Sequence, residues 1–491
     1  MQVVDQTKKT FTHVYNKVDG IREPLSRFHR NNLIIAEMAR YKPNMDLKSR
    51  RPRRLHVAIA IVCIGILMFM GWRIFQWVFV IDPLLGIYGM LVGYVIVQQF
   101  VCSYFFYRDP WQKAKKNQRV KTVLQYEPPK VSVVIATKNE KFIIYDAVYS
   151  CLNSSYQNLE VVIVNDGSDD GGVTAAAVDE LVKANPGRVK AKHLAKNEGK
   201  RKAMREGVRI ATGELVVFLD SDTIVEKDAI GRLVSCMIDD PDLGAIVGYC
   251  RALNSDENWL TKMQDTWYHS AFTIGKGMEH SLGTVSCCSG ILSAYRMQAI
   301  LPCLDRWAND HFLGVDFMAG DDRQLTAYVL GGNKYTIDKN LKQWKTGYCE
   351  SAISISETPA KLKKFVRQQV RWMQSWTRVL FFTAPWYYKH RHPLALTDYY
   401  LRMGLSYLAP VIAVMNLIIA PLTGHYDSTI VYILGLTLLS MLYAMDFRLY
   451  NPHTGKKWLY RVAFTFLSVS CLYFLLYYSI YTIRKNDWLT R

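Results

Sequence analysis

Four apolar runs long enough to cross a lipid bilayer constrain the fold of this chain more than any other feature. None of the four contains Asp, Glu, Lys or Arg. A helix needs about 20 consecutive apolar residues to cross the hydrocarbon core of a bilayer. We therefore predict an integral membrane protein with transmembrane helices at 55–72, 84–107, 404–423 and 429–445.

Lys and Arg residues beside these runs predict the orientation of the helices. KSRRPRR (48–54) and KAKKNQRVK (113–121) bracket the first pair, whereas the loop 424–428 has no Lys or Arg. The first pair is thus expected to form a hairpin, with the long middle part of the chain in the cytoplasm. A fifth apolar run, 462–483, is flanked by Lys and Arg at both ends. We predict an interfacial or re-entrant helix at 457–485 and a cytoplasmic C-terminus.

The formal net charge of +19 is compatible with nucleic acid or with anionic lipid as a partner. Because the basic clusters adjoin the apolar runs, they would face the headgroups of the cytoplasmic leaflet. We therefore expect the lipid bilayer as a partner and no nucleic acid. The ten cysteines form no C-x-x-C pair, so neither a zinc site nor a disulfide framework is expected.

The long middle segment alternates short β-branched runs with stretches of helical spacing. Runs at 131–137, 159–166 and 214–222 are predicted strands, with helices between them. This alternation predicts a mostly parallel sheet with helices on both faces, and such sheets bind ligands beyond the carboxyl ends of their strands. The polar residues expected at that edge are Thr137, Asn139, Glu140, Asp166, Asp220 and Asp222.

Two motifs at this edge suit phosphate chemistry. Asp220 and Asp222 can address one hard divalent cation shared with a diphosphate, although a bare D-x-D also occurs in surface turns. KNEGKRKA (196–203) opens a helix whose basic residues either meet phosphate or form a solvated helix start. The chain contains neither G-x-x-x-x-G-K-S/T nor G-x-G-x-x-G, which disfavours an NTPase or a dehydrogenase.

Two further motifs follow in the chain. AGDDRQL (319–325) sets two carboxylates side by side, which suits acid–base chemistry, or a helix N-cap in which an acid satisfies free amides. RQQVRWMQSW (367–376) lies on an amphipathic stretch before the third apolar run. Its Arg and Trp residues can clamp a diphosphate and face a sugar ring, or they belong to a membrane-interface helix.

In this order and between membrane segments, the motifs D-G-S, D-x-D, G-D-D and Q-x-x-R-W resemble those of processive family 2 glycosyltransferases. The resemblance is strongest to membrane-integrated, streptococcal-type hyaluronan synthases, and it covers roughly residues 85–491. The first 54 residues have no counterpart in that pattern. The stretches that carry it are GIYG, NEGKRKA, FLDSDT, LTKMQDTWYHSAF, CSGILSAYR, FLGVDFMAGDDRQLT, RQQVRWMQSW and TIRKNDWLTR.

The resemblance implies an α/β GT-A fold, which binds nucleotide sugars, inserted in the cytoplasm between transmembrane helices. We expect a monomer in the plasma membrane. The expected segments are a cytosolic extension (1–54), two transmembrane helices (55–108), the GT-A domain (125–355), amphipathic interface helices (356–393), two transmembrane helices (394–446), the interfacial or re-entrant helix (457–485) and a cytosolic tail that closes over the nucleotide (486–491).

The resemblance also implies roles for individual residues. Asp166 and Lys200 would contact uridine, Asp220 and Asp222 would hold the diphosphate with Mg²⁺ or Mn²⁺, and Trp372 would face the acceptor. The implied substrate-binding set is Thr137, Glu140, Asp166, Lys200, Arg201, Asp220, Gln368, Trp372, Cys288, Ser289, Trp488 and Arg491.

Inverting transfer from a UDP-sugar needs a base that accepts the proton of the attacking hydroxyl. Asp322 is the expected base, with Asp321 and Arg323 setting its position and ionisation. Arg371 would stabilise the departing diphosphate. The expected enzyme is a hyaluronan synthase that alternates UDP-N-acetylglucosamine and UDP-glucuronate and extrudes the growing polysaccharide through its own channel.

Some departures from the family pattern touch the acceptor side and the tail. Ile291 and Leu489 replace a proline and a glycine, and TIGKGMEHS (273–281) lacks an acid and is one residue longer. The alternative enzyme is a chitin or chitin-oligosaccharide synthase, which uses UDP-N-acetylglucosamine only. A membrane scaffold with a degenerate transferase domain is disfavoured by the intact acids, and a transporter by the absence of charged residues in the four runs.

Overall fold

The computed structural model describes residues 78–140, 143–316 and 320–484. The predicted extension 1–54, the first predicted transmembrane helix at 55–72 and the tail residues Trp488 and Arg491 lie outside the described residues.

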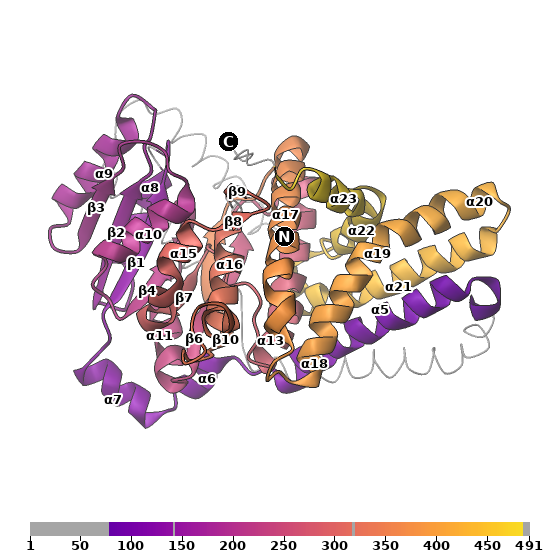
Figure 1. The fold of residues 1–491 in the computed structure, drawn as a ribbon, viewed down its shortest axis with the longest axis horizontal. Helices are drawn as coiled ribbons and strands as arrows, with labels where there is room; N and C mark the ends of the chain where they lie inside the picture. The colour runs from indigo at the N-terminus through magenta and orange to yellow at the C-terminus, as the bar shows by residue number, and fades with distance from the viewer. Residues whose placement is uncertain (1–77, 141–142, 317–319, 485–491) are drawn as a thin grey trace. The chain divides into compact units, whose positions relative to one another are not determined.

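An eight-stranded sheet forms the core of the predicted GT-A domain (125–355), which is called the catalytic part below. Its strand order is β3-β2-β1-β4-β7-β6-β10-β5 (Figure 1). The strands β1, β2, β3 and β4 are parallel neighbours, and β6 runs parallel to β10. Strand β7 is antiparallel to both β4 and β6 and joins the two parallel parts. The strand bounds are β1 Val131–Thr137, β2 Leu159–Asn165, β3 Val189–His193, β4 Leu215–Phe218, β5 Thr223–Val225, β6 Leu243–Ala252, β7 Ser293–Arg296 and β10 Lys345–Ser356.

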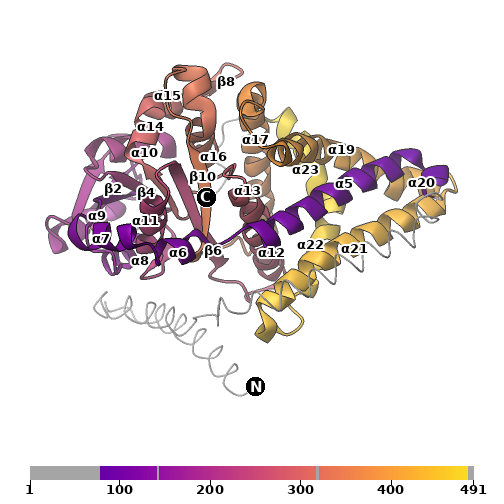
Figure 2. The same ribbon diagram turned by 90° about the horizontal axis from the view of Figure 1, so that it is seen from below.

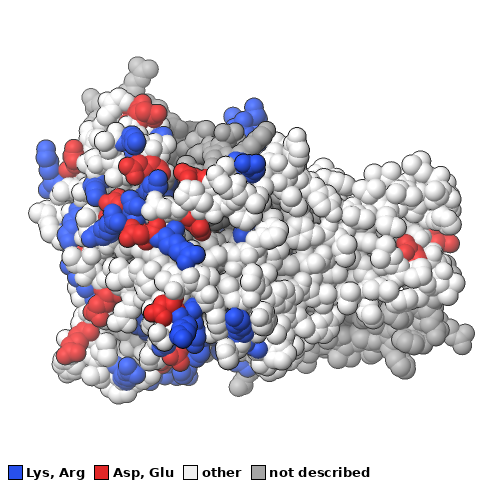
Figure 3. Space-filling view, in the orientation of Figure 1, with Lys and Arg blue, Asp and Glu red and all other residues white. Residues whose placement is uncertain are grey.

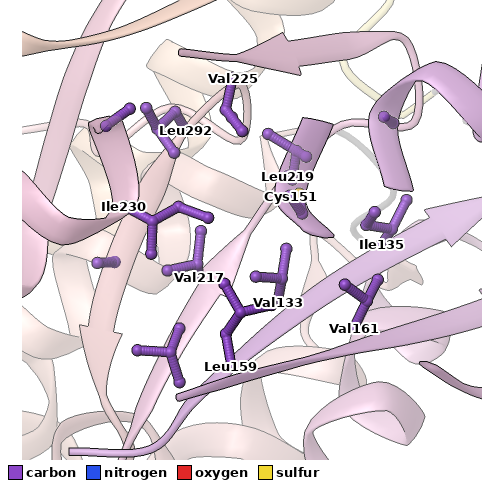
Figure 4. Close-up of a cluster of buried hydrophobic side chains, with 14 of the residues drawn as sticks. Val133, Ile135, Cys151, Leu159, Val161, Val217, Leu219, Val225, Ile230 and Leu292 are labelled. Carbon is purple, nitrogen blue, oxygen red and sulfur yellow. The ribbon is translucent and has the colours of Figure 1, made fainter. Parts of the chain in front are cut away.

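Alternate residues of the central strands bury two different helical layers, so the predicted parallel sheet with helices on both faces is confirmed. Figure 4 shows Val133 and Ile135 of β1 on the face that packs against Cys151 of α8 (Ile143–Leu152) and Ile230 of α11 (Ala229–Asp239). Val134, which lies between Val133 and Ile135, belongs instead to the core under α10 (Lys200–Ile210). This period of two is what a strand buried on both faces requires.

Four helical segments among the described residues are long and apolar enough to cross a membrane: Pro83–Ala114, Pro393–Leu422, Tyr426–Tyr450 and Leu459–Tyr481. The first and third contain the predicted helices at 84–107 and 429–445, and the second covers the predicted helix 404–423 up to Leu422. In Figures 1 and 2, α5 (Pro83–Val101), α19 (Arg402–Val414) and α21 (Tyr426–Tyr450) run side by side away from the sheet. Figure 3 shows Lys and Arg gathered over the sheet, while the visible face of these helices is almost without charge.

The fourth segment comprises α22 (Leu459–Leu467) and α23 (Tyr473–Tyr481), joined by a π-helical turn. In both ribbon views it lies near the sheet end of the helical layer and far from α20 (Ala420–Leu422). Its length and hydropathy nevertheless suit a full crossing. The interfacial or re-entrant path, which rests on the flanking charges, therefore stays a prediction.

Polar contacts connect the membrane helices to the catalytic part. Asp446 of α21 is buried and accepts hydrogen bonds from His269 at 2.9 Å and Thr273 at 3.3 Å. The long helix α17 (Leu362–Tyr387) holds the end of α23, because Gln374 donates to the Thr482 carbonyl at 3.0 Å. The amphipathic stretch predicted before the third apolar run is thus a continuous helix in contact with both parts.

The path of α22 and α23 decides on which side of the membrane the chain ends. A protease-cleavable tag placed after Arg491 should be protected from protease outside intact cells, because Lys and Arg flank this segment at both ends. A tag in the loop 424–428, which we expect outside, serves as the accessible control. Cleavage of the C-terminal tag from outside would show that α22 and α23 together cross the bilayer.

Candidate active site

The polar residues predicted to follow the strands do meet at one edge of the sheet. Strands β1, β2 and β4 are neighbours and parallel, so their carboxyl ends lie together. Thr137 donates a hydrogen bond to Glu140 at 3.2 Å, and the Asp166 amide donates to the Thr137 carbonyl at 2.9 Å. All three residues are buried. This convergence gives the candidate site its nucleotide side.

Asp166 organises the loop before α10. Its two carboxylate oxygens accept hydrogen bonds from the Glu198 and Gly199 amides at 2.8 and 3.0 Å. Burial raises its pKa, and the two amide donors oppose that shift. The following residue, Gly167, has φ +56° and lies so close to Lys196 that a Cβ atom would stand 2.2 Å from its backbone. D-G is therefore required here by the close approach of two loops.

The Lys200 ammonium lies between two acids rather than out at the edge of the site. Its Nζ is 2.6 Å from Asp220 Oδ1 and 3.1 Å from Asp321 Oδ2. Burial alone would lower the pKa of Lys200, but Asp220 and Asp321 outweigh it and raise the pKa. The sequence prediction for Lys200 was uridine contact. The structure shows it joining the D-x-D and G-D-D motifs.

Arg201 is 4% exposed and points into the protein rather than into the open site. Its guanidinium lies over the Trp307 ring, 5.9 Å from the ring centre. Trp307 is fully buried and donates through Nε1 to the Asp321 carbonyl at 2.9 Å. Arg201, predicted to bind substrate, thus supports the start of α16 (Asp321–Ala327). Sequence reasoning missed Trp307, because an apolar residue of a short helix carries no chemical signature.

The two adjacent acids have opposite environments. Burial would raise the pKa of Asp321, but Lys200 and Arg201 outweigh it and hold that pKa below its ordinary value. Asp322 is also buried, and burial together with the neighbouring charge of Asp321 raises its pKa despite Arg323 and Lys200. No ion pair of Asp322 occurs among the described residues. Two carboxyl groups with pKa values pushed apart are the usual arrangement for separate roles in acid–base chemistry.

The helix-cap interpretation of G-D-D-R also has a structural basis. The N-cap position is Gly320, with φ +73°, and it offers no side chain. Asp322 Oδ1 accepts from the Arg323 amide at 2.7 Å, so an acid does satisfy one free amide of the first turn. The second oxygen, Oδ2, faces Cys287 Sγ at 3.5 Å. One carboxylate oxygen therefore serves the helix, and the other is directed to the acceptor side.

On the acceptor side, the adjacent cysteines have different places. Cys288 is fully buried in the core, and its amide donates to Thr326 at 2.9 Å, whereas Cys287 reaches Asp322. Ser289 Oγ is buried without a hydrogen-bond partner among the described atoms. The resemblance implied that Cys288 and Ser289 line the acceptor site; the structure buries Cys288 in the core and places Cys287 beside Asp322.

The Cys287 carbonyl accepts a hydrogen bond from Lys276. Lys276 ends the π-helical stretch Ala271–Lys276, which overlaps the segment 273–281 that was expected to be one residue longer than the family pattern. A π-helical turn is what one inserted residue produces in an α-helix. Lys276 therefore lies beside Cys287, the residue that reaches Asp322.

Helix α17 carries the residues of Q-x-x-R-W. The Trp372 ring stacks on Trp267 at 5.9 Å between ring centres. The Trp372 ring also lies 6.3 Å from the Tyr268 ring, between ring centres. Gln368 Oε1 is buried and lacks a hydrogen-bond partner among the described atoms. Helix α17 thus packs through Trp372 against Trp267 and Tyr268.

A narrow hollow extends from α16 toward the membrane helices. Its lining mixes cations and aromatic rings, the side chains that bind sugars in proteins, and includes Ser286, Arg323, Trp376, Tyr387, Tyr399 and Arg402. Arg323 is the residue after the candidate base. The hollow therefore begins beside the acceptor side of Asp322.

A cation site at D-x-D would be partial. Among the described residues, no group of three or more His, Cys, Asp or Glu side chains could hold a metal ion. Asp220 and Asp222 supply two carboxylates, and burial and the charge of Asp220 raise the pKa of Asp222 to about 6. Two carboxylates fit Mg²⁺ or Mn²⁺, because such ions are usually held by one or two carboxylates, with waters or substrate phosphates as the other ligands.

The chain is similar to several known glycosyltransferases. The model of Glycosyl transferase family 2 matches residues 132–301. An N-acetylglucosaminyltransferase of Azorhizobium caulinodans is 30% identical over 373 residues, covering 74% of this chain and 87% of the relative. One of Bradyrhizobium diazoefficiens is 29% identical and covers 74% and 72%. A mannosyltransferase from Pyrobaculum calidifontis, solved with GDP-Man and Mn²⁺, is 17% identical with a TM-score of 0.48, over 78% of this chain and 99% of that chain.

The sheet and its polar edge define a sugar-transferring enzyme with a GT-A fold. The chain belongs to glycosyl transferase family 2 and is related to rhizobial N-acetylglucosaminyltransferases. The expected glycosyltransferase is thereby confirmed. The narrower resemblance to hyaluronan synthases is not specifically supported by these relatives.

Replacing Asp322 by Asn should remove the proton acceptor and keep the shape of the site. Because general-base help is typically worth about 10²–10⁴ in rate, transfer should fall by that order while UDP affinity survives. Asp321→Asn should cost less, since Asp321 is engaged with Lys200. Polymer yield and UDP affinity of both variants provide the measurement. A larger loss of transfer in Asp321→Asn would mean that the other carboxylate is the base.

Cys287 offers a finer test of the same side of the site. Cys287→Ala removes the group that faces Asp322 and should lower kcat about 2- to 10-fold, the range of a lost hydrogen bond, with unchanged UDP affinity. Cys287→Ser keeps a donor and should recover most of the rate. Cys288→Ala, which alters only the core, is the matched control. Equal losses in the Ala and Ser variants would argue against a contact with Asp322.

Proposed function

We propose that this protein is a processive, inverting glycosyltransferase that adds N-acetylglucosamine from UDP-N-acetylglucosamine to a growing saccharide. The relatives carry the name N-acetylglucosaminyltransferase and align with 74% of the chain, which favours a synthase of the chitin-oligosaccharide type. The observation that carries the proposal is the separation of the two acids. Asp321 is engaged with Lys200 on the nucleotide side, whereas Asp322 faces the acceptor side.

In the proposed reaction, Asp322 takes the proton of the acceptor hydroxyl as its oxygen bonds to the anomeric carbon. The bond from that carbon to the UDP oxygen breaks on the opposite face, and the electron pair leaves with UDP, so the configuration inverts. Arg371 supplies positive charge to the leaving diphosphate. Trp372 and the Trp267 ring under it would support the acceptor sugar.

Asp220 and Asp222 would hold Mg²⁺ or Mn²⁺ together with the diphosphate. Such an ion supplies positive charge that offsets the charge developing on the departing UDP. Asp166, Thr137 and Glu140 would form the uridine side. Each of these roles rests on the position of the residue at the sheet edge.

Hyaluronan synthesis is the second candidate, and one feature favours it. Lys276 and Arg323 flank the acceptor side of Asp322, and neither has a carboxylate within ion-pair distance among the described residues. Two such cations would suit a sugar that carries a carboxylate, such as glucuronate. UDP-glucuronate would then be a second donor, and the acceptor would alternate between neutral and acidic ends.

The four apolar helices indicate an association with a membrane. We propose a plasma-membrane enzyme with a cytoplasmic catalytic domain, in which the hollow that begins at Arg323 leads the product toward a channel between the membrane helices. The basic flanks and the position of α17 between the two parts support this orientation.

Membranes that contain the enzyme, supplied with UDP-N-acetylglucosamine and UDP-glucuronate singly and together, distinguish the candidates. We expect UDP-N-acetylglucosamine alone to give a saccharide that chitinase degrades. Product formed only with both donors, and degraded by hyaluronidase, would establish the second candidate. The Asp322→Asn variant is the control for background incorporation. Absence of N-acetylglucosamine from every product would refute the proposed function.

A further inference from the structure

A single ammonium group occupies the centre of the site. Lys200 is the first residue of α10, Asp220 follows β4, and Asp321 is the first residue of α16. Lys200 Nζ contacts Asp220 Oδ1 at 2.6 Å and Asp321 Oδ2 at 3.1 Å. Three distant segments of the chain thus share one positive charge.

This contact competes with the role proposed for Asp220. An ammonium that donates to Asp220 Oδ1 engages an oxygen that a divalent cation would need as a ligand, and two positive charges at one carboxylate repel each other. The site is also closed on the Gly290 side, because a Cβ atom there would stand 3.1 Å from Asp220 Oδ1 and 3.4 Å from Lys200 Nζ. The cation and the ammonium cannot both use this oxygen without a shift of one of them.

Asp321 gives the Lys200 ammonium a second carboxylate with which it can pair. Its side chain is 14% exposed, and its backbone carbonyl is fixed by Trp307. The side chain of Lys200 can therefore leave Asp220 and remain paired with Asp321. Asp220 is 29% exposed and is open to solvent on another side, so a cation can reach it.

We propose that Lys200 is a built-in counter-ion, which neutralises Asp220 while the donor site is empty and withdraws onto Asp321 when the metal and nucleotide bind. The proposal rests on the metal role of Asp220 in the proposed function. It makes the empty site a poor site for free metal and favours binding of metal and nucleotide together. Asp321 then serves as the residue that receives the displaced ammonium and is not itself a metal ligand.

Binding of Mn²⁺ without nucleotide tests the proposal, measured by electron paramagnetic resonance on the full-length protein in lipid nanodiscs. Lys200→Met removes the competitor and should tighten Mn²⁺ binding by about fivefold or more, the scale of a partly buried ion pair. Asp321→Asn removes the second carboxylate that can pair with the Lys200 ammonium and should weaken Mn²⁺ binding by a similar factor. In the double variant, Asp321→Asn should have no further effect, because no ammonium remains to be displaced.

Two control variants show whether a change in Mn²⁺ affinity comes from the contact between Lys200 and Asp220. Lys202→Met removes one positive charge from the same helix without touching Asp220 and should leave Mn²⁺ binding nearly unchanged. Lys200→Arg keeps the charge and should not show the tightening of Lys200→Met.

Unchanged or weaker Mn²⁺ binding in Lys200→Met would overturn the proposal, as would the absence of Mn²⁺ binding in both that variant and the wild type. An equal loss from Asp321→Asn with and without Lys200 would also overturn it, because Asp321 would then be a metal ligand. None of these readouts depends on which sugar is transferred. The proposal and the proposed sugar specificity can therefore fail separately.

Discussion

The pairing of Lys200 with Asp220 and Asp321 is the interaction on which the rest of the site depends. The edge of the sheet brings Asp220, Asp222, Asp321 and Asp322 into one partly buried region, where like charges raise one another's pKa and resist joint ionisation. One ammonium group at 2.6 and 3.1 Å from two of them offsets that repulsion. Without it, the turn after β4 and the start of α16 would repel each other. Asp322 has no such ion pair among the described residues, and burial together with the charge of Asp321 raises its pKa.

The catalytic part and the membrane helices are connected by buried polar contacts as well as by apolar packing. Asp446 of α21 is held by His269 and Thr273 of the catalytic part, and Gln374 of α17 holds the end of α23. A buried carboxylate that loses its partners is costly, so these contacts fix α12 (Trp259–Ser270) against the membrane layer. Helix α17 also bears Arg371 and Trp372, so the positions of these two candidate site residues depend on the membrane helices as well as on the sheet.

The sheet and its polar edge could be predicted because strand burial follows the sequence period directly. Thr137, Asp166 and Asp220 end strands in the sequence, and parallel pairing alone brings them together. The direction in which individual side chains point was harder to predict from the sequence. Arg201 was expected to bind substrate, but its guanidinium lies over the buried Trp307 ring. Cys288 was expected to line the acceptor site, but it lies in the core while its neighbour Cys287 reaches Asp322, since one residue of register on an irregular loop decides which side chain is buried. Trp307 itself has no pattern in the sequence that distinguishes it from any core residue.

The π-helical stretch Ala271–Lys276 shows how a chain of this kind can change one half of its site independently of the other. An inserted residue rotates everything after it in an α-helix by about 100°, given 3.6 residues per turn, unless a wider turn absorbs the excess. A wider turn such as Ala271–Lys276 would confine an extra residue to this stretch, and the contact of His269 on α12 with Asp446 lies before it. The donor side, built on β1, β2 and β4, lies on other elements. Gain or loss of a single codon at this point could therefore alter acceptor preference in one evolutionary step, with nucleotide binding untouched.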